Sequence, residues 1–548
     1  MYSNCVGEQI GKRLLHGLSV LLATVLLITA GAACRESPIK EAEPTGSLLD
    51  TSSETTAPDP LTGKYTASAE VYHQRADADE VRPTGNCAQL MLPLSGGADV
   101  EAEKLRNSIL NAKNTKYNYK ISGTVYYISA DGSDLNDGKS DKTPFRTIGS
   151  LNSISLKAGD AVLFERGSIW RLTEPISAVD GITYGSYGTG EKPTIYGSPK
   201  NYADPNLWTP SNMKNVWKVD FGYKDAGCMV FDHGKDVGVK MQSGLKQLTQ
   251  NGYFFHNEND GILYLYSDKG NPGYLYNDIE ISPNSSIFYL PSYVSNVTID
   301  NFCLKYCGKL AVDCGFSNNN VNVTNCEIGF IGGSNLSSTV RYGNGVQFWS
   351  GTENSVVENN WIYQIFDTAI SFQGMDGKNY INVSFSNNLM EYNDMDIELW
   401  DSKPNYEIRN CRVENNIMRF NGYGWGTRLN DGGIRGGEVS LMLKFYSCSF
   451  CEISIKNNII DKNNYRAITF QKPPTVADHI TVSGNTLFAD ASHADNTAVV
   501  IGKLANDTTG QVFTAPSVST SYKADNQAQL ESALRAFDNS PSVVKWLS

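Results

Sequence analysis

Histidine and basic charge are both scarce in this chain of 548 residues. Six histidines occur, and their spacings are not those of a zinc site (His16, His73, His233, His256, His479 and His493). Lysine and arginine together number 46 against 58 acidic residues, which gives a net charge of −12. Nucleic-acid binding requires a basic surface, so no nucleic acid is expected as a partner.

The amino terminus carries an apolar run that is short for a membrane span. Lys12 and Arg13 precede this run, which ends in small residues directly before Cys34. This ending resembles a bacterial lipoprotein signal, in which Cys34 is the lipidated first residue of the mature chain. We therefore expect a signal peptide over residues 1–33 and an exported protein at the bacterial cell surface or in the periplasm, with plain secretion as the alternative.

The eleven cysteines show no even, regular framework, although four of them are crowded together at Cys303, Cys307, Cys314 and Cys326. An exported protein raises the alternative of disulfide bonds. We interpret the cysteines instead as small side chains that pack in the interior like apolar residues.

One short phrase recurs through the second half of the chain: a β-branched strand, an Asn turn and a second short strand. The second Asn of the phrase returns in steps of about 28 residues, with one longer step of about 42. These positions are Asn360, Asn388, Asn416, Asn458 and Asn485. Such a step is typical of a solenoid, because an insertion leaves the stack as a loop. Since stacked Asn side chains can hydrogen-bond to one another, the phrase predicts the coils of a parallel β-helix.

A second block of sequence supports this interpretation. Residues 124–167 contain a strand, an Asp/Asn/Gly turn, a Pro-Phe-x-Thr sequence beginning at Pro144 and a Gly-Asp-led strand beginning at Gly159. The block resembles the opening coils of secreted right-handed parallel β-helix carbohydrate-active proteins, over residues 124–200 and again over 295–490. The resemblance implies right-handed coils. It does not specify an activity, because this fold carries lyases, hydrolases, epimerases and adhesins.

The predicted fold class is all-β: a single-stranded right-handed parallel β-helix with a small β insertion and helical caps. Helical composition after Ala98 predicts a helix that covers the open end of the stack. The predicted parts are a signal peptide (1–33), a disordered Ser/Thr/Pro-rich tether (34–85), an N-terminal cap with the first coils (86–200), a β-rich insertion (201–290), the main β-helix (291–500) and a strand and helix cap (501–548).

Alternating apolar residues in the second strand of successive coils predict two outward columns of side chains. One column would hold Gln347, Ser371, Glu398 and Thr469, and its neighbour would hold Trp349, Gln373, Trp400 and Gln471. Because the apolar faces of sugar rings stack on aromatic planes, outward Trp side chains favour a carbohydrate as the ligand.

Four carboxylates fall in the same register: Asp367, Asp394, Asp396 and Glu398. Hydrolysis of a glycosidic bond needs a carboxylic acid and a second carboxylate as base or nucleophile. Glu398, Asp396 and Asp367 are therefore candidate catalytic residues. Asp367, Asp394 and Asp396 would instead be ligands if the protein depended on Ca²⁺. Taken singly, Asp367 and Asp394 also suit turns at coil corners.

The longest insertion is rich in Gly and aromatic residues, and it suits a wall over the same face. It carries Gly-Tyr-Gly-Trp-Gly, and Glu-Leu-Trp lies about one coil earlier, at Glu398. The two motifs are similar to a group of exported bacterial β-helix proteins that degrade polysaccharides. That group continues with His, Gln and Arg-Pro-Asp, where this chain has Thr427 to Asp431. We take Asp431 as a further catalytic candidate, and the substrate-binding candidates are Trp349, Gln373, Trp400, Tyr423, Trp425 and Arg428.

Three functions stay open on these residues. The first is a glycoside hydrolase that acts on an extracellular polysaccharide through paired carboxylates. The second is a Ca²⁺-dependent lyase on a uronate polymer, with a base such as Arg428, Arg435 or Lys444, which the acidic net charge disfavours. The third is a glycan-binding surface lipoprotein without catalysis. In each case the partner is a polysaccharide or oligosaccharide, membrane contact is only through a lipid at Cys34, the chain is a monomer, and Ca²⁺ is the one cofactor considered.

Overall fold

The computed structural model describes residues 67–70, 97–337, 340–427, 439–445, 448–463, 466–470, 479–490, 497–501 and 543–547. The chain divides into two units, residues 1–57 and 58–548, and every described residue belongs to the second. The predicted signal peptide, the lipid anchor at Cys34 and most of the tether lie outside the described residues. Among the described residues, the helices are too short or too polar to cross a membrane.

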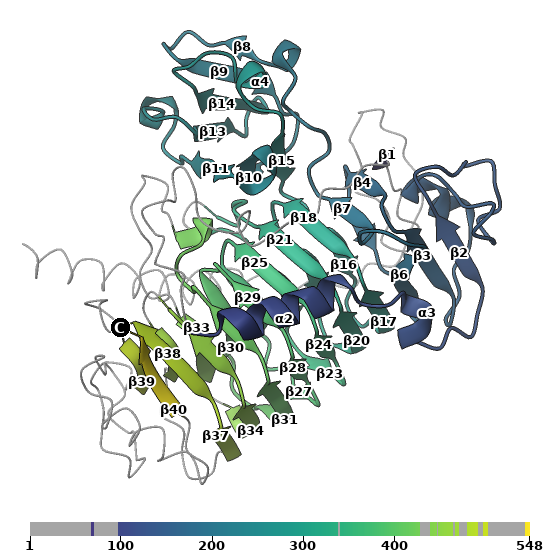
Figure 1. Cartoon of the computed structure of the whole chain (residues 1–548), viewed down its shortest axis with the longest axis vertical. Coiled ribbons are helices and arrows are strands. Elements are labelled where there is room, and N and C mark those ends of the chain that lie inside the picture. Colours follow the sequence, from purple (N-terminus) through teal and green to yellow (C-terminus); the bar gives the residue numbers. More distant parts are fainter. Residues whose placement is uncertain are drawn as a thin grey trace, which may run out of the picture. The chain divides into compact units, whose positions relative to one another are not determined.

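Three sheets of short strands form the body of this unit (Figure 1). Apart from the antiparallel pair of β1 and β4, neighbouring strands within each sheet are parallel. The twelve-stranded sheet contains β2 (Val125–Ile128), β3 (Ala161–Glu165), β6 (Thr183–Tyr187), β17 (Ser295–Asp300), β20 (Asn318–Thr324), β23 (Thr352–Glu353), β24 (Val356–Glu358), β27 (Tyr380–Ile381), β28 (Ser384–Ser386), β31 (Tyr406–Glu414), β34 (Cys448–Lys456) and β37 (His479–Ser483).

The other two sheets are built from the strands that follow in each coil. The eleven-stranded sheet contains β1 (Ala67–Glu70), β4 (Ile169–Leu172), β7 (Thr194–Tyr196), β18 (Cys303–Cys307), β21 (Glu327–Ile331), β25 (Trp361–Ile365), β29 (Leu389–Glu391), β32 (Ile417–Arg419), β35 (Ile459–Asp461), β38 (Thr486–Asp490) and β40 (Val543–Leu547). The nine-stranded sheet contains β5 (Ile176–Ser177), β16 (Phe288–Leu290), β19 (Val312–Cys314), β22 (Val346–Trp349), β26 (Thr368–Gly374), β30 (Met395–Asp401), β33 (Val439–Phe445), β36 (Arg466–Phe470) and β39 (Thr497–Ile501). Successive turns contribute strands to all three sheets, with two short strands in the twelve-stranded sheet at β23–β24 and at β27–β28. This is the topology of a parallel β-helix, so the predicted fold class is confirmed.

The Asn residues that mark the repeat form a buried ladder. The side-chain oxygen of Asn388 accepts hydrogen bonds from the backbone N–H and the side-chain amide of Asn360, both at 3.0 Å. Asn388 makes the same pair of bonds to Asn416 and also donates to the carbonyl of Val357 at 2.9 Å. The preceding residue, such as Asn387 with φ 54°, adopts the left-handed conformation that Asn tolerates. The first Asn of each pair therefore forms the turn between two strands. The second Asn forms hydrogen bonds with backbone groups that are buried at this corner.

The interior of the coils is apolar and includes the cysteine side chains. Residues such as Val346, Phe348 and Ile370 are fully buried in one continuous cluster. Cys314 and Cys326 are thiols in the same cluster, as the sequence interpretation predicts. Burial raises the pKa of the Cys326 thiol to about 12, which keeps it protonated and unreactive.

The predicted N-terminal helix forms, but it lies along the side of the coils instead of over their open end. Helix α2 (Asp99–Leu110) crosses the strands of the eleven-stranded sheet, as Figure 1 shows. Just before it, the backbone N–H of Ala98 donates to Asp461 at 3.1 Å. Further along, Arg106 binds the carboxylate of Glu391 with contacts of 2.6 and 2.9 Å. A hydrogen bond to one coil and a buried ion pair to another hold the helix, which explains its position. A second short helix, α3 (Thr115–Asn118), follows it.

The β-rich insertion folds as two further sheets. Their strands are β8 (Thr209–Pro210), β9 (Val216–Asp220), β10 (Ala226–Phe231), β11 (Asp236–Val237), β12 (Val239–Lys240), β13 (Tyr253–Asn257), β14 (Ile262–Tyr266) and β15 (Ile279–Pro283), with the short helix α4 (Pro272–Leu275). Strands β13 and β14 form the expected antiparallel hairpin. Short 3₁₀ helices lie at 148–153, 205–207, 232–234, 245–247 and 425–427.

Candidate functional site

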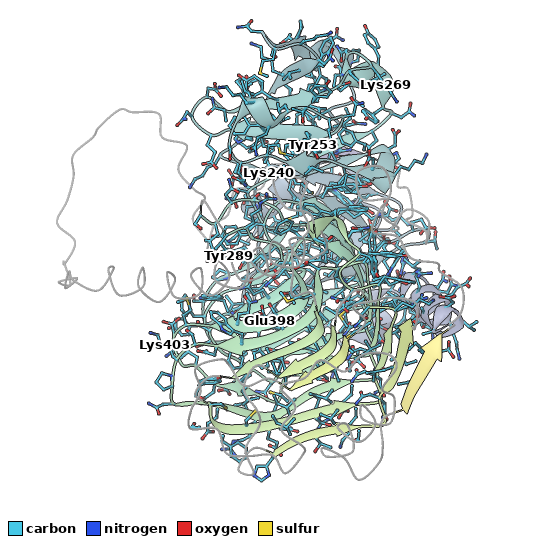
Figure 2. All side chains as sticks on the ribbon, turned by 90° about the vertical axis from the view of Figure 1, so that its left-hand side faces the viewer. Lys240, Tyr253, Lys269, Tyr289, Glu398 and Lys403 are labelled. Atoms are coloured by element: carbon cyan, nitrogen blue, oxygen red, sulfur yellow. The ribbon has the colours of Figure 1, made fainter. Side chains whose placement is uncertain are left out.

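The outer face of the nine-stranded sheet carries a column of polar side chains. Strands β16, β19, β22, β26 and β30 pair in register and align one residue from each coil. Alternate residues of these strands are buried in the coil core, so the residues between them lie on the outer face. The column is Tyr289, Asp313, Gln347, Ser371 and Glu398. Figure 2 labels its two ends, Tyr289 and Glu398.

Glu398 is the carboxylate with the best-defined surroundings in this column. It lies mid-strand in β30 and is only 5% exposed. Its Oε2 accepts a hydrogen bond from the side-chain amide of Gln373, which belongs to the adjacent strand β26. A carboxylate has two oxygens, and this bond positions one of them. The hydrogen bond fixes the orientation of the Glu398 carboxylate, and the strand holds its backbone. Both features are those expected of a reacting group.

Two Trp side chains flank this bond. The register aligns Trp349, Gln373 and Trp400 on three neighbouring strands. The ring centroids of Trp349 and Trp400 are 6.4 Å apart, with 46° between the ring planes. Both rings are partly exposed, so together they form an aromatic surface beside Glu398. The predicted columns through these three strands are therefore present.

The register beyond Glu398 differs from the prediction by one coil. Strand β33 lies between β30 and β36, so Glu398 is next to Met442, and Thr469 is one strand further away. Trp400 is likewise next to Lys444. The Asn spacing predicts one long loop between Asn416 and Asn458. In fact the coil of Asn416 keeps its third strand, and the insertion stands before that strand.

Of the other predicted carboxylates, Asp394 and Asp396 are less accessible than Glu398, whereas Asp367 is more exposed. Asp394 and Asp396 are buried, and Asp396 has no exposed surface. The side-chain amide of Asn393 donates to Asp396 at 3.1 Å. Asp367 is partly exposed and stands at the turn before β26, where its carbonyl accepts a hydrogen bond from the backbone N–H of Met395 at 2.7 Å. The candidates Arg428 and Asp431 lie outside the described residues.

The Gly-Tyr-Gly-Trp-Gly segment is a packing element, and Tyr423 and Trp425, two of the substrate-binding candidates, are buried in it. The two side chains are only 3% and 5% exposed and belong to an apolar cluster. The ring of Trp425 packs on Phe366 with centroids 5.1 Å apart, and its ring N–H donates to the carbonyl of Gln364 at 2.8 Å. Side chains of the preceding coils cover the faces of both rings. This packing fixes the segment against those coils.

The glycines of this segment have a steric role. A Cβ at Gly426 would lie 2.1 Å from the carbonyl oxygen of Phe366, and one at Gly424 would lie 2.0 Å from that of Tyr392. We expect Gly426→Ala to lower the free energy of unfolding by about 1–3 kcal/mol, because the backbone must move to admit the methyl group. Chemical denaturation measures the change. An unaltered denaturation midpoint would contradict this close packing.

Within the described part of the chain, no three or more His, Cys, Asp or Glu side chains are grouped as they are around a metal ion. Asp367, Asp394 and Asp396, the Ca²⁺ ligands considered from the sequence, are all described and do not form such a group.

The sequence prediction lacks three residues of the site, Tyr289, Asp313 and Asn344. Asn344 donates to the side chains of Gln347 at 3.1 Å and Ser371 at 2.9 Å, so it orders the middle of the column. Asp313 extends the column by one coil and pairs with Lys309 at 2.6 Å. Val312-Asp313-Cys314 has the same inward-outward-inward alternation as the later coils, and this signal could have identified Asp313.

No protein-family model matches the sequence, and no curated protein matches it significantly. Among solved structures, the chain is similar to a GH136 lacto-N-biosidase from Eubacterium ramulus (14% identity, TM-score 0.36, covering 69% of this chain and 67% of the other). It is also similar to XylC in complex with xylose (15% identity, TM-score 0.39, 67% and 69%) and to pectate lyase Pel9A (10% identity, TM-score 0.35, 76% and 86%). The resemblance stated from the sequence is confirmed for the fold, by the coil topology itself. Function has to be inferred from this chain's own side chains.

Proposed function

We propose that this protein is a glycoside hydrolase that cleaves a polysaccharide bound along the outer face of the nine-stranded sheet. One observation carries the proposal: Glu398, held by Gln373, stands beside the paired rings of Trp349 and Trp400. An oriented carboxylate next to an aromatic surface provides both the acid–base group and the sugar platform that this chemistry needs.

The aromatic surface would set the position of the substrate. The two rings come from strands separated by β26, and their centroids are 6.4 Å apart. Two neighbouring sugar rings of one chain would stack on this pair. The bond between two stacked sugars would then lie over Gln373, which is between the two Trp residues in the register and donates a hydrogen bond to Glu398 in the adjacent column.

Two carboxyl groups complete the reaction. One protonates the glycosidic oxygen as the bond to the anomeric carbon breaks, and the other deprotonates the attacking water or attacks the anomeric carbon itself. Glu398 is one of the pair. Asp396, whose Cβ is roughly 6.6–7 Å away on the same side of β30, and Asp367 at the preceding corner are the two candidates for the other.

Replacing Trp400 tests whether the aromatic surface formed by Trp349 and Trp400 binds the substrate. We expect Trp400→Ala to weaken substrate binding about tenfold or more, because a stacked sugar loses its aromatic partner. Release of new reducing ends from a panel of neutral and uronic polysaccharides gives KM, and the change should be in KM more than in kcat. Trp217→Ala, a partly buried indole of the insertion, is the matched control and should leave KM unchanged. An equal KM in wild type and Trp400→Ala would count against the platform.

A further inference from the structure

A polar pocket lies where the β insertion meets a loop of the coils. It has a volume of about 470 Å³, and its walls come from the insertion and from the loop after β21. Figure 2 labels Lys240 on the insertion, whereas Glu398 belongs to the coil strands. The lining residues on which the inference rests are Asp225, Gln242, Glu258, Asn335, Leu336 and Tyr342.

The floor of this pocket is a buried ion pair. Nζ of Lys240 contacts both carboxylate oxygens of Asp225 at 2.8 Å, and the backbone N–H of Asn335 donates to the same carboxylate at 2.6 Å. Both charged side chains are almost fully buried. Burial opposes ionisation of Asp225, but His256 and Lys240 more than offset it and hold the pKa of Asp225 below its ordinary value. The floor is thus a rigid, charge-compensated base that joins the insertion to the coils.

The rim of the pocket presents amide and carboxylate groups. The side-chain amide of Gln242 donates to Oδ1 of Asn335 at 2.7 Å, and the amide of Asn335 donates to Glu258 at 3.1 Å. Besides the atoms in this network, Gln242 carries its side-chain carbonyl oxygen and Glu258 carries a second carboxylate oxygen. Such groups accept hydrogen bonds from hydroxyls in several directions.

One wall of the pocket is less polar. Leu336 is 54% exposed although it is a large apolar side chain, and both Leu336 and Tyr342 line the pocket. Lys309 lies over the ring of Tyr342, with Nζ 5.1 Å from the centroid. The C–H face of a sugar fits an apolar wall of this kind while its hydroxyl edge faces the amides.

We propose that this pocket binds one neutral sugar residue. The volume falls within the range of small-molecule sites, roughly 300–1,000 Å³. Hydroxyl groups match the amide and carboxylate rim, and Leu336 and Tyr342 provide the apolar wall. The site suits a neutral sugar better than a uronate, because the charges around it balance: Lys224 and Glu258 in the lining carry opposite charges, and the Lys240 charge is already compensated by Asp225. This proposal does not depend on hydrolysis at Glu398.

The pocket also lies close to the polar column. Lys309, which covers Tyr342, binds Asp313 at 2.6 Å, and Asp313 is aligned with Gln347 in the column. Asp313 and Glu398 are three strands apart, which is roughly 14 Å at about 4.8 Å per strand. A sugar in the pocket could therefore belong to the same chain as a glycan lying over the column.

Saturation-transfer NMR on the mature chain tests the pocket directly. The probes are single neutral sugars (hexoses, pentoses and N-acetylhexosamines) and the matching uronates. Gln242 is partly exposed and Glu258 is exposed, so Gln242→Ala and Glu258→Ala should preserve the fold. We expect at least one neutral sugar to bind, with affinity reduced about tenfold in each pocket variant and unchanged in Trp217→Ala, a partly buried indole of the insertion that does not line this pocket.

Three results would overturn the proposal. The first is no saturation transfer to any neutral sugar. The second is binding that both pocket variants leave intact, including binding that only Trp400→Ala removes. The third is a uronate that binds more tightly than its neutral counterpart. Since the readout is binding, an inactive Glu398 would not affect it.

Discussion

Glu398→Gln should lower kcat by about 10²–10⁴-fold while leaving the fold intact, because the amide can neither give nor take a proton in the transition state. The replacement has nearly the same shape and keeps a hydrogen-bonding partner for Gln373. Substrate affinity should therefore change much less than turnover. Initial rates of reducing-end release, together with binding of the intact polysaccharide to the variant, separate the two effects.

A matched glutamate gives the control. Glu353 is exposed on β23, in the twelve-stranded sheet, and Glu353→Gln should keep full activity. Asp396→Asn and Asp367→Asn then identify the second carboxylate, since only one of them should reproduce the loss seen at Glu398. Retention of more than half the wild-type rate in Glu398→Gln would remove Glu398 from the chemistry.

Asn388→Ala should lower the free energy of unfolding by about 3–5 kcal/mol, because it breaks the buried ladder in its middle. The variant leaves the backbone N–H and the side-chain amide of Asn360 without their acceptor. It also deprives Val357 of a donor. Each buried polar group left without a partner costs about 1–3 kcal/mol. Denaturant unfolding followed by circular dichroism measures the loss.

An exposed ladder on another corner provides the control for this prediction. Asn382 donates to Asn354 and accepts from Asn410, both at 2.8 Å, but these side chains are in contact with water. Asn382→Gly tolerates the local φ of 55° and should cost less than about 1 kcal/mol. Equal losses at Asn388 and Asn382 would show that the ladder matters through the turn and not through burial.

The coils and their spacing could be predicted because the sequence repeats the physical constraint once per turn. The second Asn of each phrase forms the same hydrogen bonds with buried backbone groups at every corner. The repeat therefore requires Asn at 360, 388 and 416, and this makes it visible in the sequence. The pairing of β22, β26 and β30 followed from alternation, since a slip of one residue would turn Phe348 to the outside. For the same reason the sequence alone predicts the column that contains Glu398 and Gln347.

Other features depend on contacts that no local pattern encodes. Strand β33 was missed because the insertion after Asn416 obscured the repeat. Tyr423 and Trp425 looked exposed in a Gly-rich segment, but their burial depends on Phe366 and Tyr392, which belong to earlier coils. The course of α2 along the stack is set by pairs such as Arg106 with Glu391, almost three hundred residues apart in sequence. The sequence around either partner of such a pair does not indicate which residue it will contact.

The mass of the products tests the central claim most directly. A defined oligosaccharide of a polysaccharide that the wild-type protein cleaves would be digested and analysed by mass spectrometry. Hydrolysis predicts two fragments whose masses sum to the substrate plus one water, and their loss in Glu398→Gln. Fragments that sum to the substrate alone, one of them with an unsaturated uronate, would show elimination and contradict a hydrolase. Intact substrates across the whole panel, with glycan binding retained, would equally contradict it and favour a binding protein.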